Sequence, residues 1–271
     1  MARRRRLVLK LGGELLERPD DLALVARAIA ALAATHALVV VHGGGREIDA
    51  GLALAGIPKH QVDGLRITDA ATLDVVVAVV AGSINTRLVG AVRKAGGRAV
   101  GLTGADAGVA IMKRSAPIVT VAGETVDLGL VGAPVSHGAP QLLLDLTARG
   151  YVPVVACIGA SATGQIFNVN ADTLASHIAG AVGASRLVIA GGTSGVLDDA
   201  QRTIPRLTSR QALALIKAGT ANRGMVAKLQ ACRSALQRGV ADVVIANGRQ
   251  VDLAALADPK ASLSGCTQVV T

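Results

Sequence analysis

The sequence predicts an α/β protein built on a mostly parallel sheet that helices cover on both faces. Along the 271 residues, apolar runs of strand length alternate with segments of helical periodicity, an order typical of parallel strands joined by right-handed crossovers. Hydrophobic residues make up 51% of the chain but aromatic residues only 1%. The core must therefore consist of Ala, Val, Leu and Ile, whose β-branched members suit buried parallel strands. So apolar a chain is not disordered.

The individual elements follow from local patterns. A helix is expected over residues 20–33, where apolar residues recur at helical spacing behind Asp20, a suitable N-cap. Residues 71–95 predict one long helix or two abutting ones. Short β-like segments between residues 109 and 131, separated by Pro and Gly, predict antiparallel hairpins beside the sheet. The expected strands of the sheet itself are residues 7–11, 37–41, 98–102, 152–157, 186–190 and 242–246.

The chain contains no linker rich in Pro or Ser, so its parts are expected to be tightly joined. A boundary is expected near Ala184, because the second half restarts with its own strand and its own glycine-rich turn. This division gives an N-terminal lobe of residues 1–184 and a C-terminal lobe of residues 185–271.

The charge balance favours anionic partners. Lys and Arg number 28 against 19 Asp and Glu, a net charge of +9. Nucleic acid and phosphorylated small molecules are both anionic, but proteins that bind single strands stack bases on aromatic side chains. With one Tyr, one Phe and no Trp, the chain is expected to bind small anions and no nucleic acid.

Cysteine usage and hydropathy predict a cytoplasmic protein. Three cysteines without CxxC spacing indicate neither a disulfide framework nor a zinc site. The apolar stretches are shorter than about 18 residues or are broken by Gly and charge, so no membrane span is expected. The basic run at residues 3–6 is interpreted as the solvated flank of the first strand, because Lys10 and Glu14 interrupt the apolar stretch of a would-be signal peptide.

Three glycine clusters directly follow predicted strands. They are Gly12-Gly13, residues 43–45 and residues 191–195. Strand carboxyl ends form the ligand crevice of a parallel sheet, and glycines there let backbone N–H groups approach a phosphate or carboxylate. Any one cluster could be an ordinary tight turn, but three at one sheet edge predict an anion site.

Common glycine motifs do not account for these clusters. Residues 219–224 have P-loop spacing, but Met225 follows where the P-loop has Lys. His42 and the three glycines after it look like an esterase oxyanion loop, yet the chain has no G-x-S-x-G nucleophile elbow. No G-x-G-x-x-G dinucleotide fingerprint begins at Gly43 either. The hydrolase and dinucleotide dehydrogenase interpretations lose their main support.

Two basic residues near these turns are candidate ligands of anions. Lys10 lies within the first apolar strand, where an unpaired ammonium is costly to bury, so it is expected to meet an anion. Arg66 could form a bidentate pair with a carboxylate or could be a surface residue beside a turn.

Four polar residues in the second half of the chain are further candidates. Asn168 and Asn170 place two amides on one side of an extended segment. Asp172 starts a helix and could be an N-cap. Lys228 lies early in another helix, where a solvent-facing lysine is the plain alternative to a site residue.

In their joint order these motifs resemble the amino acid kinase family, and most closely its branch that phosphorylates acetylglutamate. The resemblance runs nearly from end to end and implies an αβα sandwich of three layers with an amino-acid lobe, an ATP lobe and a homodimeric assembly. The motifs are residues 9–13 (LKLGG), 41–45 (VHGGG), 63–69 (DGLRITD), 101–104 (GLTG), 127–129 (DLG), 167–172 (FNVNAD), 224–228 (GMVAK) and 265–270 (GCTQVV).

The resemblance also implies a reaction: ATP donates its γ-phosphoryl group to the side-chain carboxylate of N-acetyl-L-glutamate. Such transfer depends on positioning and charge neutralisation. By resemblance, Lys10 and Lys228 flank the migrating group and Asp172 holds the two lysines. Mg²⁺ is expected to be held mainly by ATP and water, since the sequence shows no dedicated carboxylate cluster.

The remaining site residues follow in the same way from the resemblance. Arg66 is expected to take the α-carboxylate of the acetylamino acid, and Asn168 to help fix it, with Asn170 as a second contact. The backbone N–H groups of Gly12, Gly13 and Gly44 are expected to donate to the phosphoryl group. Gly44 and Gly45 also match acetylamino-acid contacts, and the ATP turn comprises Gly192, Thr193, Ser194 and Gly195.

The chain also departs from the family. Its turn at residues 191–195 is one residue longer than usual and lacks the usual Asp. In the last motif, Cys266 stands between the usual Gly and Thr, where it is expected to disturb the last strand.

Arginine-inhibited relatives carry an additional N-terminal helix, whereas Lys10 here follows only nine residues, so a dimer insensitive to arginine is expected. N-acetylaminoadipate as the acceptor, or a non-catalytic regulatory protein on this fold, remain the alternatives.

Overall fold

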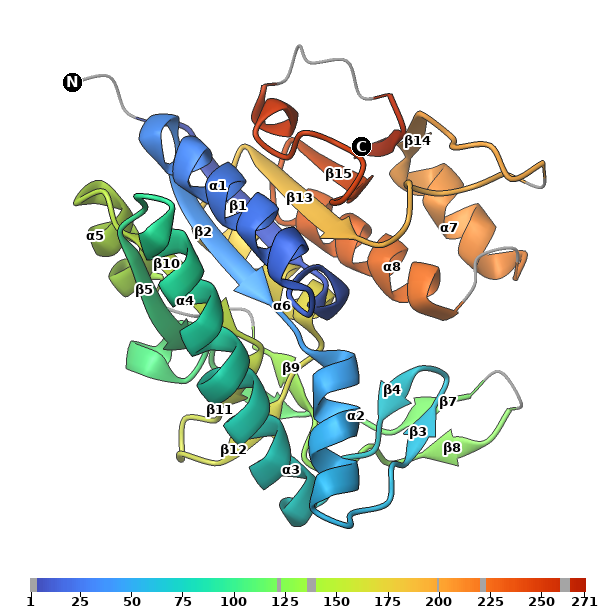
Figure 1. Ribbon diagram of the computed structural model, residues 1–271. Coiled ribbons are helices and arrows are strands. Elements are labelled where there is room, and N and C mark those ends of the chain that lie inside the picture. Colours follow the sequence, from blue (N-terminus) through green and yellow to red (C-terminus); the bar gives the residue numbers. More distant parts are fainter. Residues whose placement is uncertain (1–3, 121–122, 136–139, 199, 220–222, 259–263) are drawn as a thin grey trace.

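An eight-stranded sheet runs through the protein in the order β14-β16-β15-β13-β1-β2-β10-β5 (Figure 1). This computed structural model describes residues 4–120, 123–135, 140–198, 200–219, 223–258 and 264–271. All neighbouring strands are parallel except β15 and β16. The strands are β1 (Arg6–Leu11), β2 (Ala37–His42), β5 (Ala99–Thr103), β10 (Val152–Ala156), β13 (Arg186–Gly191), β14 (Arg206–Thr208), β15 (Asp242–Asn247) and β16 (Cys266–Val270). Each of the six predicted strands is thereby confirmed.

Helices cover both faces of the sheet, as predicted. Along β1, Leu7, Leu9 and Leu11 pack with α1 and α4, whereas Val8 packs on the opposite face with α5, α6 and α8. This alternation is the period of two of a strand that is buried on both sides. Figure 1 shows α1 and α4 lying in front of the strands. The helices are α1 (Pro19–Thr35), α2 (Gly45–Leu54), α3 (Ala70–Val76), α4 (Asn85–Lys94), α5 (Gln141–Ala148), α6 (Ala171–Ala181), α7 (Ser209–Lys217) and α8 (Arg223–Gln237).

The start of α1 corrects one prediction. Arg18 is the N-cap residue and makes no side-chain capping hydrogen bond, so Asp20 does not cap the helix. Pro19 instead occupies the first turn, where its missing N–H costs nothing. Asp20 and Asp21 follow in that turn, where negative charge complements the helix dipole.

The predicted long helix is continuous from Ala70 to Lys94, because a π-helical stretch (Val77–Ile84) joins α3 to α4. Its length and hydropathy are those of a helix able to cross a membrane, and 33% of its most apolar window is buried inside the protein. The helix packs on the sheet and against α1 and α2. A core helix of a soluble protein can have the same length and hydropathy, so the absence of a membrane span stays a prediction.

Small antiparallel sheets lie beyond the carboxyl ends of the central strands. Within the region predicted to form hairpins, β7 (Ile118–Val119) pairs with β8 (Thr125–Val126); residues 121–122 lie outside the described part. Nearby, β6 (Met112–Arg114) pairs with β9 (Gly132–Pro134). Two further pairs carry candidate site residues: β3 (Gln61–Val62) with β4 (Leu65–Arg66), and β11 (Ile158–Ala160) with β12 (Ile166–Asn168).

The two halves of the chain share the central sheet. β1 pairs directly with β13, Leu7 opposite Arg186, and both clusters of core residues draw on both halves. The division at residues 184 and 185 therefore stays a proposal. Contrary to expectation, Cys266 does not disturb the last strand, since it pairs with Ala246 within a regular ladder.

Candidate active site

The three glycine turns meet at the carboxyl edge of the sheet, after β1, β2 and β13. There the turn after β1 packs directly on the turn after β2: a Cβ on Gly13 would lie 2.8 Å from the Cα of Gly44. A Cβ on Gly44 would collide with the side chain of Ile84. Close approach of the backbone thus requires glycine at position 13, and a side chain at position 44 would force the buried Ile84 to move. Gly13 and Gly44 also begin helical turns, whose first N–H groups have no partner inside the helix.

A buried carboxylate lies between two lysines beside these turns. The Nζ of Lys10 is 2.8 Å from Asp172 Oδ1, and the Nζ of Lys228 is 3.5 Å from Oδ2. Lys10 and Asp172 are only 6% and 5% exposed. Burial alone would lower the pKa of Lys10 and raise the pKa of Asp172, but their mutual attraction shifts both pKa values the other way, reinforced by Glu14 for Lys10 and by Lys228 for Asp172. Lys10 and Asp172 are therefore both charged at neutral pH.

The second asparagine of the FNVNAD segment has a structural role. The Oδ1 of Asn170 accepts hydrogen bonds from the N–H groups of Asp172 and Thr173, at 3.0 and 3.1 Å. Asn170 is therefore the N-cap of α6, and the alternative interpretation of Asp172 as the cap is wrong. The capped turn fixes Asp172 at the start of the helix, facing Lys10.

Arg66 is buried, which contradicts its interpretation as a surface residue. Its Nη2 donates to Asp49 and, at 3.4 Å, to the carbonyl oxygen of Gly45, whereas its buried Nη1 has no hydrogen-bond partner. Hydrogen bonds from Lys59 and Arg66 outweigh burial and hold the pKa of Asp49 below its ordinary value. Nearby, the Nδ2 of Asn168 donates to the hydroxyl of Thr68 at 3.1 Å. An unpaired buried guanidinium N–H is a donor suited to a ligand carboxylate.

Two adjoining cavities collect the predicted residues. The first, of about 240 Å³, is lined among others by the residues proposed to contact the acetylamino acid and the phosphoryl group: Lys10, Gly12, Gly13, Gly44, Gly45, Arg66, Asn168, Asn170, Asp172 and Lys228. The second, of about 390 Å³, shares Glu14, Gly45 and Lys228 with the first and extends to Gly192 and Thr193. Lys228 is thus not a solvent-facing helical lysine, since it stands where the cavities meet.

The turn at residues 191–195 is held from within the protein. The N–H of Gly192 donates to Glu14 Oε1 at 2.8 Å, and the hydroxyl of Ser194 donates to Gln250 at 2.8 Å. Gly195 has a φ of +81°, and a Cβ there would lie 2.8 Å from the backbone nitrogen of Thr267. Ser194 and Gly195 lie outside the lining of the two cavities.

One predicted hydrogen-bond donor is already used. The N–H of Gly12 donates to the carbonyl oxygen of Ala190 at 2.8 Å and so extends the ladder between β1 and β13. The expectation that this N–H donates to a phosphoryl group is therefore wrong for this geometry. Gly12 contributes by lacking a side chain, because a Cβ there would lie 2.6 Å from Glu14 Oε1.

Sequence patterns missed two acidic residues of the site, Glu14 and Asp49. Asp49 lies one helical turn after Gly45, a spacing that places it on the same side of α2 as the glycine turn. Glu14 directly follows the first glycine pair, but no local pattern shows that it reaches Gly192.

Among the described residues, no group of three or more His, Cys, Asp or Glu could hold a metal ion. Residues 220–222 of the P-loop-like string, and residue 3 of the basic run, lie outside the described part.

His42, in the second glycine turn, is a buried neutral imidazole. Its Nδ1 lies 3.2 Å from the carbonyl oxygen of Gly43, and the Nδ2 of Asn85 donates to its Nε2 at 3.0 Å. Because Asn85 also donates to the carbonyl of Val154, its amide orientation is fixed and the imidazole proton resides on Nδ1. Burial lowers the pKa of His42 to about 4. The ring therefore orients the turn and does not exchange protons at neutral pH.

This lowered pKa predicts a loss of stability in mild acid. Between pH 6.5 and 4 the unfolded chain binds a proton at this residue and the folded protein does not, so the free energy of unfolding falls as the pH falls through that window, by up to about 3 kcal/mol. His177, with its pKa also lowered by burial to about 4, acts in the same direction. Asp172, whose pKa is depressed, loses its contribution only below about pH 4. Urea denaturation at several pH values measures this effect. Across this pH window the free energy of unfolding of His42→Gln should fall less steeply with decreasing pH than that of the unaltered protein. Equal slopes for the two proteins would contradict the prediction.

Comparison with known proteins agrees with this geometry. The profile of the amino acid kinase family matches residues 5–247. Acetylglutamate kinase of Rhodopseudomonas palustris (strain BisB5) is 42% identical over 90% of this chain and 83% of its own length. The Solibacter usitatus enzyme of the same name is 44% identical over 90% of this chain and 91% of its own.

A solved structure shares the fold. N-acetylglutamate synthase of Neisseria gonorrhoeae, in complex with coenzyme A and N-acetyl-glutamate, superposes with a TM-score of 0.81 over 99% of this chain and 60% of that longer one. At 23% identity this likeness concerns the fold alone. The αβα sandwich is thereby confirmed, and with the profile match over most of its length the chain belongs to the amino acid kinase family.

Proposed function

We propose that this protein transfers the γ-phosphoryl group of ATP to the side-chain carboxylate of N-acetyl-L-glutamate, the reaction of the acetylglutamate kinases it resembles. The observation that carries the proposal is the buried Lys10–Asp172–Lys228 cluster, set where the glycine turns meet and beside an arginine with an unpaired N–H. The relatives of that name match about 90% of the chain.

The chemistry needs charge neutralisation more than proton transfer. A carboxylate oxygen of the acceptor forms the new bond to the γ-phosphorus, the bond from that phosphorus to the β–γ bridging oxygen breaks, and ADP leaves with the electron pair. The acceptor is already an anion at neutral pH, so no general base is required. Lys10 and Lys228 stabilise the charge on the transferring group, and Asp172 holds both ammonium groups in place.

The remaining residues position the two substrates. Arg66 is proposed to bind the α-carboxylate of the acetylamino acid through its unpaired Nη1, with Asn168, Asn170, Gly44 and Gly45 around the acetyl and carboxylate groups. Gly13 and Gly44 offer backbone N–H groups to the phosphoryl group. The nucleotide is proposed to lie along Gly192, Thr193, Ser194 and Gly195 in the C-terminal lobe. Mg²⁺, held mainly by ATP oxygens and water, would neutralise phosphate charge, which fits a site without a carboxylate cluster among its described residues.

The decisive assay measures ADP release with Mg-ATP and hydroxylamine, which traps an acyl phosphate as a hydroxamate. N-acetyl-L-glutamate, N-acetyl-L-aminoadipate, free glutamate and no acceptor are compared. Turnover and hydroxamate with acetylglutamate alone would support the proposal. Preference for N-acetyl-L-aminoadipate would identify the acceptor as the homologue that is longer by one methylene. No turnover with any acceptor would favour the alternative of a non-catalytic regulatory protein.

The assignment of Arg66 predicts a selective loss of substrate affinity. Arg66→Lys keeps the positive charge but removes the planar pair of donors, so the KM for acetylglutamate should rise about 10- to 100-fold while the KM for ATP changes little. Steady-state kinetics with each substrate varied separately measure the effect. The control is Lys59→Met, which removes the other partner of Asp49 at the surface and should leave both KM values unchanged. Equal changes in the two KM values would contradict the role of Arg66.

We also propose a cytoplasmic homodimer. At the edge of the sheet, every residue of β5 is half-buried or exposed, and the neighbouring helix from Ala70 to Lys94 is apolar but largely unburied. An edge strand beside an apolar helix is a surface that a second copy would cover. Light scattering should give the mass of two chains.

A further inference from the structure

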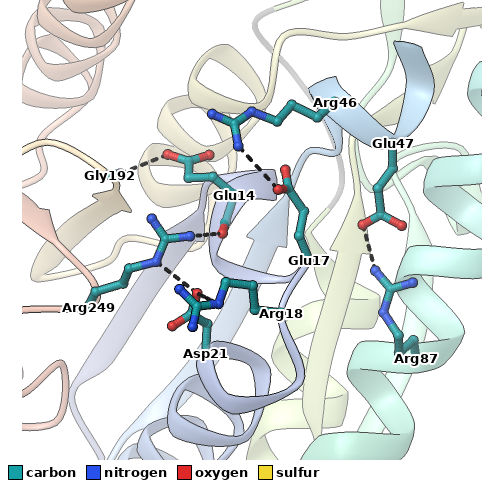
Figure 2. A network of polar contacts seen from close by, with 9 residues as sticks. All are labelled: Glu14, Glu17, Arg18, Asp21, Arg46, Glu47, Arg87, Gly192 and Arg249. Carbon is teal, nitrogen blue, oxygen red and sulfur yellow. Dashed lines mark hydrogen bonds and ion pairs between the residues drawn. The ribbon is translucent and has the colours of Figure 1, made fainter. Parts of the chain in front are cut away.

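The side chain of Glu14 fills the space that glycines leave open between the ends of β1 and β13. Figure 2 shows its carboxylate reaching Gly192, whose N–H donates to Oε1 at 2.8 Å. A Cβ on Gly12 would lie 2.6 Å from the same oxygen, and one on Gly191 would lie 3.0 Å from it. The carboxylate thus occupies the backbone cradle in which a phosphate is proposed to bind.

Among the described residues this carboxylate makes no ion pair within 4 Å, although its charge helps to raise the pKa of Lys10 and two arginines are near. Arg249 donates to the backbone carbonyl of Glu14 and, at 2.8 Å, to Asp21 (Figure 2). Arg46 pairs with Glu17 at 3.4 Å. Both guanidinium groups are therefore engaged elsewhere, and the charge of Glu14 is left facing the cavities.

The position of Glu14 matters because it lines both cavities of the site, at their junction with Lys228. A polyphosphate placed against Gly192 meets a charge of its own sign at close range, because the carboxylate of Glu14 already accepts from the Gly192 N–H. The other carboxylates that line the two cavities are paired with cations, Asp172 with its two lysines and Glu17 with Arg46. Glu14 is consequently the group that opposes a bare nucleotide.

A divalent cation changes the sign of this interaction. Mg²⁺ prefers oxygen ligands, and proteins that bind it with a nucleotide commonly supply one or two carboxylates beside the phosphates. We propose that Glu14 makes nucleotide binding depend on Mg²⁺: its carboxylate keeps metal-free nucleotide out of the glycine cradle and accepts nucleotide that carries the cation. This inference rests on the proposed function, since it takes the nucleotide site to be the one described above.

Calorimetry tests the inference without turnover. Binding of AMP-PNP is measured in excess Mg²⁺ and in EDTA for the unaltered protein, Glu14→Gln and Glu14→Ala. Glutamine keeps the acceptor for the Gly192 N–H and removes only the charge. Because like charges in close contact are strongly unfavourable, Glu14→Gln should bind metal-free AMP-PNP at least about tenfold more tightly than the unaltered protein. The Kd ratio, defined as the Kd in EDTA divided by the Kd in excess Mg²⁺, should therefore be smaller for Glu14→Gln than for the unaltered protein.

A matched control removes the same charge nearby. Glu47 of α2 pairs with Arg87 at 2.6 Å and contacts neither cavity, so Glu47→Gln should keep the Kd ratio of the unaltered protein. An unchanged Kd ratio in Glu14→Gln would overturn the inference. Tighter binding of metal-free AMP-PNP by Glu14→Ala alone would overturn it too, because the size of the Glu14 side chain, and not its charge, would then be what opposes the nucleotide. If the unaltered protein bound AMP-PNP in neither buffer, the proposed function itself would fail and this inference with it. Circular dichroism confirms that each variant is folded.

Discussion

Replacing Lys228 with methionine should lower kcat for phosphoryl transfer by about 10²- to 10³-fold, the usual cost of removing one group that stabilises transition-state charge. Lys228 reaches the junction of the two cavities from α8, and its ammonium lies 3.5 Å from Asp172. Its contribution grows as charge develops on the transferring group, so the KM values should change much less than kcat. Initial rates of ADP release, with both substrates saturating, measure the effect.

The control for this variant is Lys217→Met. Lys217 is exposed in the last turn of α7, and its removal subtracts the same charge from the same lobe. Its kcat should equal that of the unaltered protein. Because Asp172 keeps Lys10 at 2.8 Å, Lys228→Met should also unfold within about 1 kcal/mol of the unaltered protein, which separates a catalytic effect from a folding defect. A kcat within about threefold of the unaltered value would refute the assignment of Lys228.

The second large effect concerns stability. Asp172→Asn should lower the free energy of unfolding by about 3–5 kcal/mol, because it leaves the ammonium of Lys10 buried without a counter-charge. The amide keeps the size of the carboxylate, so packing is little changed. Urea denaturation followed by circular dichroism measures the loss.

A double variant identifies the cause. Lys10→Met combined with Asp172→Asn removes both buried charges and should recover most of the stability that Asp172→Asn loses, although it remains inactive. If the double variant were as unstable as Asp172→Asn, unpaired charge would not be the cause. If Asp172→Asn unfolded like the unaltered protein, the pair would contribute nothing to stability.

Much of the fold was predictable because its signals are local. Each central strand is a short apolar run, and the helix from Ala70 to Lys94 shows its period within its own sequence. The predictions failed where neighbours decide. Asp20 has the chemistry of an N-cap, but Pro19 starts the helix one residue earlier. Cys266 looks like an insertion in a motif, yet it pairs with Ala246 as a regular residue of the last strand.

Within the site, the sequence alone determined which residue types are available and where the chain turns. Glycines after three strands, a lysine inside an apolar run and the FNVNAD segment are all visible in the printed letters. Their convergence follows from topology, because the ends of parallel strands lie at one edge of a sheet.

Only the tertiary structure decided how these groups are engaged. It placed Asp172 between two lysines, of which Lys228 is 56 residues away in the sequence. It also brought the carboxylate of Glu14 to accept a hydrogen bond from Gly192, 178 residues away in the sequence. It also committed the N–H of Gly12 to the sheet and left the Nη1 of Arg66 unpaired. The physical reason is that periodicity and turn chemistry report on a few neighbouring residues, whereas hydrogen bonds and charge pairing depend on distances that exist only once the chain has folded.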